Sequence, residues 1–164
     1  MSNKRKENIE MKHVKLILCL VVLAFCLTAC SKGSKDITVD VDKLADELQS
    51  QAVTSDALSK TSLDLSSIYF IDADQMEKGV AYLSNASTAC EVAVIECKES
   101  SQTANVEKLF KTRVSNQSDL FASYNAGEVA KLNKAVIKTS GKYAVLCVCD
   151  DTGKAEEILK NYGF

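Results

Sequence analysis

The sequence predicts an α+β domain with an antiparallel-rich, four-stranded sheet and helices packed on one side of it. Two pairs of short apolar segments are typical of β-hairpins, and the residues between them recur at helical spacing. The predicted order is one helix, a hairpin, two helices, a second hairpin and a final helix. Hairpins separated by helices favour an antiparallel sheet with its helices segregated to one face.

The first helix is predicted to begin beside Asp40 or Asp42, either of which can cap it. Its apolar residues share one helical face, and these are Val41, Leu44, Leu48 and Ala52. Residues 55–77 follow amid serines and aspartates. They predict a short helical turn and irregular structure.

The first hairpin is predicted from strands at residues 79–83 and 89–97. The second strand alternates between two largely apolar faces. One face holds Cys90, Val92 and Val94, and the other holds Glu91, Ala93, Ile95 and Cys97. A strand that is apolar on both faces is expected in the centre of the sheet.

The longest helix is predicted over residues 102–124. Its apolar residues recur at helical spacing, and they are Val106, Leu109, Phe110, Val114, Leu120, Phe121 and Tyr124. A break at residues 125–127 is followed by a short helix over residues 128–134.

The second hairpin is predicted from strands at residues 135–139 and 142–150. The pair Ser140-Gly141 between them is a two-residue hairpin turn. An amphipathic helix over residues 151–162 completes the fold.

Arg113 and Gln117 fall within the apolar stripe of the long helix, where a polar face is not expected. A buried guanidinium must be paired, and Glu91 interrupts an apolar strand face in a position to pair with it. One hypothesis is a small pocket for an anionic ligand, lined by Arg113, Glu91, Gln117 and Tyr124. The alternatives are an internal ion pair between helix and sheet, or an arginine that reaches solvent at the rim.

The first thirty residues predict a secretory signal peptide. Five basic residues precede residue 16, and residues 16–27 form an apolar segment without a charge. This segment is shorter than the ~20 apolar residues that a spanning helix needs. Translation can start at Met1 or at Met11, since either leaves a basic segment before the apolar one.

The signal ends in Leu27-Thr28-Ala29-Cys30, which resembles a bacterial lipobox. The resemblance implies that lipoprotein-processing enzymes attach a diacylglyceryl group to Cys30 and cleave before it; the alternative is an ordinary secretory signal with a chance cysteine. Two acyl chains hold a protein stably on a membrane. The expected organisation is a signal peptide over 1–29, a lipidated terminus and flexible tether over 30–39, and one extracytoplasmic domain over 40–164.

Composition excludes several classes of function. Residues 30–164 carry 15 basic and 20 acidic side chains, a formal charge of −5, so a basic nucleic-acid binder is not expected. The single histidine, His13, lies in the signal, so the mature chain has no histidine for catalysis. No nucleophile or phosphate-loop motif is present, and no catalytic residue, metal or other cofactor is predicted.

Four cysteines remain in the predicted domain, all within apolar strands: Cys90, Cys97, Cys147 and Cys149. The last two share a strand face and are badly placed for a disulfide with each other. Buried free thiols are one interpretation. A disulfide from Cys90 or Cys97 to the last strand is the alternative, whereas the spacing does not suit zinc.

Several short motifs together resemble a family of small Firmicutes-type lipoproteins, domain of unknown function 4358. They are Ile68-Tyr69-Phe70-Ile71-Asp72, Glu91-Val92-Ala93-Val94-Ile95, Arg113 with Phe121 and Tyr124, and Gly141-Lys142-Tyr143. The resemblance covers residues 40–162. That family commonly has glycine where Phe70 stands and proline where Ala126 stands. The resemblance implies a lipoprotein on the outer face of the cytoplasmic membrane, with no established activity.

Three functional hypotheses follow. The first is a non-enzymatic, membrane-tethered module that binds an extracellular ligand or protein partner. The second is a cell-envelope hydrolase that uses carboxylates with Arg113, which would need two carboxylates in one cleft. The third is a structural envelope protein, which a large exposed apolar patch would favour.

Overall fold

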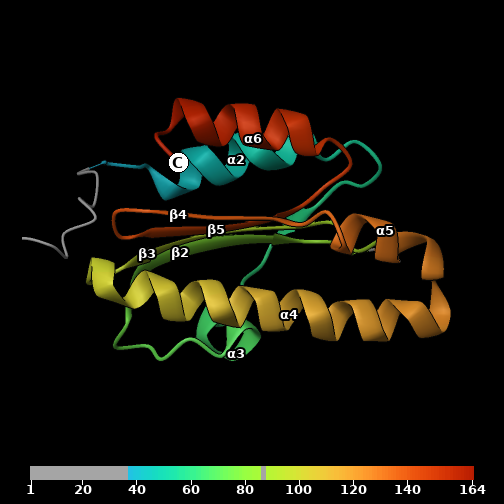
Figure 1. The fold of residues 1–164 in the computed structure, drawn as a ribbon, viewed down its shortest axis with the longest axis horizontal. Coiled ribbons are helices and arrows are strands. Elements are labelled where there is room, and N and C mark those ends of the chain that lie inside the picture. The colour runs from blue at the N-terminus through green and yellow to red at the C-terminus, as the bar shows by residue number, and fades with distance from the viewer. Residues whose placement is uncertain (1–36, 86–87) are drawn as a thin grey trace, which may run out of the picture. The chain divides into compact units, whose positions relative to one another are not determined.

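A five-stranded antiparallel sheet forms the centre of the computed structural model, which describes residues 37–85 and 88–164 (Figure 1). The strands lie in the order β1-β2-β3-β5-β4. In chain order the elements are α2 (Val41–Ala52), β1 (Ser59–Lys60), α3 (Leu65–Tyr69), β2 (Met76–Leu83), β3 (Glu91–Cys97), a 3₁₀ turn (Ser100–Gln102), α4 (Thr103–Tyr124), a second 3₁₀ turn (Ala126–Glu128), α5 (Val129–Leu132), β4 (Val136–Ser140), β5 (Tyr143–Val148) and α6 (Thr152–Asn161).

The predicted α+β class and antiparallel sheet are confirmed, but the predicted number of four strands is wrong. The additional strand is β1, whose Ser59 pairs with Leu83 at the outer side of β2. Two residues are too few to show an alternating pattern, so the sequence gives no signal for this strand.

Both predicted hairpins form, but the two-residue turn of the second is Gly141-Lys142 and not Ser140-Gly141, because Ser140 still pairs with Tyr143. β2 and β3 pair from Leu83 opposite Glu91 to Met76 opposite Cys97, and β4 pairs with β5. Gly141 has a φ of 55° in the tight turn between β4 and β5, a conformation that favours glycine. β3 and β5 then pair with each other, which places the two most apolar strands in the centre.

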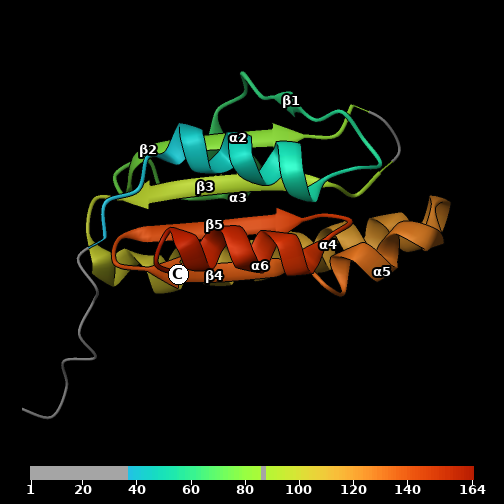
Figure 2. The ribbon, with the colours of Figure 1, turned by 90° about the horizontal axis from the view of Figure 1, so that it is seen from above.

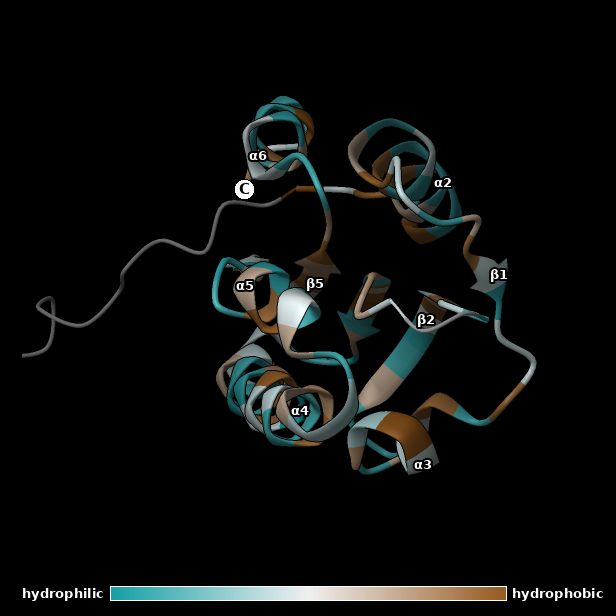
Figure 3. Cartoon of the chain, turned by 90° about the vertical axis from the view of Figure 1, so that its right-hand side faces the viewer, coloured by the Kyte–Doolittle hydropathy of each residue, from teal (hydrophilic) through white to brown (hydrophobic). Residues whose placement is uncertain are grey.

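Helices cover both faces of the sheet, so the prediction of helices on one side is wrong. Figure 1 shows α2 and α6 on one face and α3 and α4 on the other, and Figure 3 shows the same layers from the end of the sheet. The physical reason is that β5 is buried along its whole length and β3 nearly so. Both faces of these central strands are apolar, and each face needs its own cover.

Two apolar clusters fill the space between these layers. On one face, Val92 and Val94 of β3 and Cys147 of β5 pack with residues of α2 and α6. On the other, Ala93 and Ile95 of β3 pack with residues that include Val106 and Phe110 of α4. The face assignment predicted from the alternation in β3 is therefore confirmed.

Helices α2 and α6 lie side by side over the sheet (Figure 2). Asp40 caps α2 by accepting hydrogen bonds from the backbone N–H groups of Asp42 and Lys43. Asp151 caps α6 by accepting one from Lys154 at 2.8 Å. Both caps supply acceptors for N–H groups that have no partner within the helix.

Helix α4 confirms the long helix, but its apolar stripe is not buried throughout. Val106 and Phe110 are fully buried, whereas Leu120 is 52% and Tyr124 is 57% exposed. Figure 1 shows α4 extending past the ends of the strands. The last turns of the helix therefore present apolar side chains where no sheet lies beneath them.

The four cysteines of the described residues are buried and free, which agrees with the interpretation as free thiols. Cys90, Cys147 and Cys149 belong to one apolar cluster and Cys97 to the other. Within residues 37–85 and 88–164, no helix is both long and apolar enough to cross a membrane.

Candidate functional site

A cavity of about 210 Å³ lies where β2 leads into β3 and the C-terminal half of α4 passes over them. It is lined by Leu83, Ser84, Thr88, Ala89, Cys90, Glu91, Arg113, Gln117, Phe121 and Tyr124. We call it the β3–α4 pocket. All four residues singled out from the sequence, namely Glu91, Arg113, Gln117 and Tyr124, lie on its wall.

Glu91 and Arg113 form a bidentate ion pair in the wall of this pocket. Arg113 Nε lies 3.0 and 3.2 Å from the two carboxylate oxygens of Glu91, and its Nη2 lies 2.9 Å from Oε2. The Glu91 side chain is 7% exposed and that of Arg113 is 23% exposed. Burial alone would lower the pKa of Arg113, but the hydrogen bonds and charge of Glu91 outweigh it and raise the pKa. The predicted pair exists, and it is open to a pocket on one side.

Tyr69, at the end of α3, supports Arg113 from the other side. The guanidinium carbon lies 5.6 Å from the centre of the Tyr69 ring, within the range of a cation–π contact. Phe110 meets the same ring edge-on at 5.3 Å. The Tyr69 hydroxyl is buried close to the Glu91 carboxylate but does not meet it, or any other described group, in hydrogen-bond geometry. Its burial, and next the charge of Glu91, raise the pKa of Tyr69 well above its ordinary value.

The aromatic part of the pocket comes from the last turns of α4. The rings of Phe121 and Tyr124 are 4.9 Å apart and tilted by 36°. Phe121 is buried, whereas Tyr124 is largely exposed. Gln117 lies one turn before Phe121 on the same pocket wall. The pocket therefore combines an aromatic surface with an amide that can both donate and accept hydrogen bonds.

Asp56 fixes the hydroxyl groups on the strand side of the pocket. Thr88 Oγ1 donates to Asp56 Oδ2 at 2.5 Å, and Ser84 also donates to this oxygen. These hydrogen bonds favour the charged carboxylate and lower the pKa of Asp56. Thr88 Oγ1 also lies 3.0 Å from Ser84 Oγ, so the two hydroxyls and the Asp56 carboxylate form one cluster on this wall, and the Thr88 oxygen keeps lone pairs that can accept.

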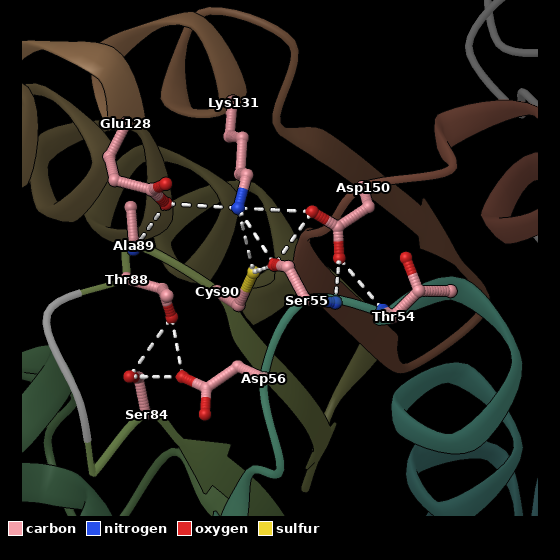
Figure 4. A network of polar contacts seen from close by, with 10 residues as sticks. All are labelled: Thr54, Ser55, Asp56, Ser84, Thr88, Ala89, Cys90, Glu128, Lys131 and Asp150. Atoms are coloured by element: carbon pink, nitrogen blue, oxygen red, sulfur yellow. Dashed lines mark hydrogen bonds and ion pairs between the residues drawn. The ribbon is translucent and has the colours of Figure 1, made fainter.

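A second polar network lies behind this wall and is centred on Lys131 of α5 (Figure 4). Its Nζ lies 3.1 Å from Glu128 Oε2 and 3.0 Å from Asp150 Oδ1, and it donates to Ser55 Oγ at 2.9 Å. Cys90 Sγ is 3.7 Å away. The amine therefore joins α5, the loop after α2, the start of β3 and the end of β5.

The carboxylates of this network also hold backbone groups. Asp150 Oδ2 accepts from the N–H groups of Thr54 and Ser55 at 2.7 and 2.8 Å, which lowers the pKa of Asp150 despite the opposing effect of burial. Glu128 Oε2 accepts from the N–H of Ala89 at 2.9 Å. The network consequently fixes the backbone that leads into β3 and into the pocket.

Ser55 and Lys131 are as close as the two members of a serine–lysine catalytic pair, but the protonation state of Lys131 does not suit catalysis. A general base must be neutral before it can accept a proton. Burial alone would lower the pKa of Lys131, but its hydrogen bonds with Asp150 and Glu128 outweigh it and raise the pKa. The amine therefore stays charged. Burial also raises the pKa of the neighbouring Cys90 thiol, which favours the protonated form over the nucleophilic thiolate.

Sequence reasoning missed several members of both networks. Thr88 lies between two predicted strands, Asp56 in the segment predicted as a helical turn and irregular structure, and Lys131 in a predicted short helix; none of the three is among the predicted site residues. Their roles depend on contacts between segments far apart in the chain, such as Ser55 with Lys131, 76 residues later. No local pattern indicates such pairs.

Leu27, Thr28, Ala29 and Cys30 lie outside the described residues. Among residues 37–85 and 88–164, no group of three or more histidine, cysteine or acidic side chains is arranged to hold a metal ion.

The fold and the pocket define a three-layer α+β domain with a small polar pocket at one end of its sheet. The chain belongs to the family described as Domain of unknown function (DUF4358), whose family model matches residues 50–149. The matched range includes every residue of the pocket wall. The searches of curated proteins and of solved structures found no match.

Proposed function

We propose that this protein is a lipid-anchored bacterial lipoprotein, held on the extracytoplasmic face of the cell membrane, whose domain binds a small ligand in the β3–α4 pocket without catalysing a reaction. One observation carries the binding role: Glu91, Arg113, Gln117 and Tyr124 converge on a single open cavity of about 210 Å³. This volume lies below the ~300–1,000 Å³ of typical drug-sized sites, which suits a small ligand.

The charges around the pocket support binding rather than hydrolysis. A carboxylate-based hydrolase needs a second carboxylate that converges on the same bond. Among the described residues that line the pocket, Glu91 is the one carboxylate, and it is engaged by Arg113. The nearby Lys131 is held in its charged form and cannot serve as a base.

The membrane anchor is proposed from the motif Leu27-Thr28-Ala29-Cys30 after a short apolar segment. The Cys30 thiol would receive the diacylglyceryl group, and the charge-free segment before it is too short for a stable spanning helix. The variant Cys30→Ala should lose incorporation of a labelled fatty acid and globomycin-sensitive processing. Cys26→Ala, which changes a cysteine within the signal, is the matched control and should keep both. Fatty-acid labelling that persists in Cys30→Ala would refute the anchor.

The binding role can be tested by filling the pocket. Gln117→Trp places a large side chain on the pocket wall, and Leu120→Trp places the same side chain on the exposed part of α4 outside it. We expect small molecules from a fragment library to give saturation-transfer NMR signals with the detergent-solubilised protein. These signals should disappear in Gln117→Trp and remain in Leu120→Trp. Fragments that bind all three proteins equally would place any binding elsewhere and refute the proposal.

A further inference from the structure

We infer that the ligand of the β3–α4 pocket is a neutral, polyhydroxylated molecule of the saccharide class. This inference rests on the proposed function, because it names the chemistry of the ligand for that pocket. Three properties of the pocket carry it: its balanced charge, its mixture of fixed donors and acceptors, and its exposed aromatic surface.

Among the described residues that line the pocket, Arg113 is the one cation and Glu91 the one carboxylate, and their charges neutralise each other. Arg113 uses Nε and Nη2 on the two oxygens of Glu91, at distances of 2.9–3.2 Å. A carboxylate or phosphate ligand would approach a neutralised guanidinium and the negative charge of Glu91 together. Recognition of an anion normally uses an arginine fork that is free to face it. This geometry favours a neutral ligand over the anionic one that the sequence suggested as a hypothesis.

The polar groups that remain offer both donors and acceptors. Arg113 lines the pocket, and its Nη1 makes no hydrogen bond within the described part of the chain. Thr88 can accept through the lone pairs of its oxygen. Gln117 can do both. A ligand that satisfies this set needs groups that donate and accept at neighbouring positions, and vicinal hydroxyl groups have this property.

The aromatic surface suits the other side of such a molecule. Tyr124 is 57% exposed at the edge of the pocket, with its ring 4.9 Å from that of Phe121. The face of an aromatic ring is negative and attracts the polarised C–H groups on the face of a sugar ring. A saccharide presents hydroxyls around its edge and C–H groups on its faces, so it can use both surfaces of the pocket.

The polar groups are held in place before a ligand arrives. Tyr69 and Glu91 fix Arg113, and Asp56 fixes Thr88. Behind them, Glu128 holds the backbone N–H of Ala89 on the pocket wall (Figure 4). Such preorganisation lowers the entropy that binding must remove, which matters for a ligand with few contacts.

The experiment uses saturation-transfer NMR on the detergent-solubilised full chain, with glucose and N-acetylglucosamine as neutral probes. Succinate, a dianion, and phenylalanine, a zwitterion, serve as probes that carry charged groups, and all four are used at millimolar concentration. We expect signals from at least one neutral saccharide and none from the charged probes. Tyr124→Ala should weaken saccharide binding about tenfold, by removing the ring surface. Leu120→Ala, at an equally exposed apolar position of α4 outside the pocket, should not change it.

The outcomes separate this inference from the proposed function. If succinate or phenylalanine binds in a Tyr124-dependent manner and the saccharides do not, the saccharide class is refuted and a ligand-binding pocket stands. If neither saccharide binds, the saccharide class is likewise refuted. If the fragment library also gives no signal that Gln117→Trp removes, the binding role itself is refuted as well.

Discussion

Replacing Arg113 by leucine should destabilise the domain, because the change leaves the Glu91 carboxylate buried without its partner. Glu91 has a side chain 7% exposed and makes three hydrogen-bond contacts with Arg113. Removing one member of a fully buried pair costs about 3–5 kcal/mol. Arg113 is 23% exposed at the pocket, so water can solvate part of the remaining charge. We therefore expect Arg113→Leu to lose about 2–3 kcal/mol of unfolding free energy.

The double variant Glu91→Leu with Arg113→Leu separates the pair from the packing of its side chains. Replacing both charges by apolar groups removes the unpaired carboxylate, and the loss should shrink to about 1 kcal/mol or less. Urea unfolding at neutral pH measures the unfolding free energy of the parent protein, Glu91→Leu, Arg113→Leu and the double variant. The coupling energy between the two side chains follows from the differences.

Lys111→Leu is the control on the same helix. Its side chain is 62% exposed and pairs with Glu107 one turn away. Such a pair contributes about 0.3–0.5 kcal/mol, so this variant should differ little from the parent protein. An Arg113→Leu variant as stable as Lys111→Leu, or a double variant less stable than either single one, would refute the account of a buried, coupled pair.

Three further predictions concern single positions. Tyr69→Phe removes a buried hydroxyl without a hydrogen-bond partner, so thermal unfolding should show a gain of about 1 kcal/mol, and a loss would show that the hydroxyl is in fact bonded. Phe70→Gly should stabilise the domain by about 0.5–1 kcal/mol in the same assay, because Phe70 has a φ of 57° and is 76% exposed. The control variant Phe70→Ala should give no such gain. Asp150 has a lowered pKa in the folded protein, so its stabilising effect is complete above its ordinary pKa of 3.8 and is lost as the pH falls through the folded value. The stability difference between the parent protein and Asp150→Asn should therefore be constant near neutral pH and shrink below about pH 4; a difference that widens on acidification would contradict the shift.

The sheet core was predictable because its signals are local. Alternation along β3 correctly separates the face of Val92 and Val94 from that of Ala93 and Ile95. The turn at Gly141 marks the hairpin of β4 and β5. Each of these signals occupies fewer than ten residues, and the backbone geometry of a strand or a turn decides it directly.

The arrangement of the layers was less accessible, although its cause was visible. The alternation in β3 already showed two apolar faces, which a sheet covered on one side cannot bury. Which face α2 and α6 cover depends on the path of the chain around the sheet, and no local sequence pattern indicates that path. The exposure of Tyr124 was missed for a similar reason, since it depends on how far the C-terminal end of α4 extends past the strands.

The pair of Arg113 and Glu91 was predictable because each residue interrupts an apolar face on its own element. The network around Lys131 has no such signature. Thr54 and Asp150 are 96 residues apart and meet only once the sheet has formed. Such ion pairs cannot be recognised in the sequence, because each charged residue on its own is indistinguishable from one on the protein surface.

The two polar networks limit the kinds of ligand that the pocket can bind. Lys131 is neutralised by Glu128 and Asp150, and Arg113 is neutralised by Glu91. Asp56 is satisfied by the hydroxyls of the pocket wall. These charged groups therefore bind one another and fix the pocket wall. A ligand would contact mainly neutral polar groups and aromatic rings. A site of this kind gains little from long-range attraction, so its selectivity must come from hydrogen-bond geometry and ring contact. Ligand binding should consequently change little between low and physiological ionic strength, whereas binding governed by an unpaired arginine would weaken as salt is added.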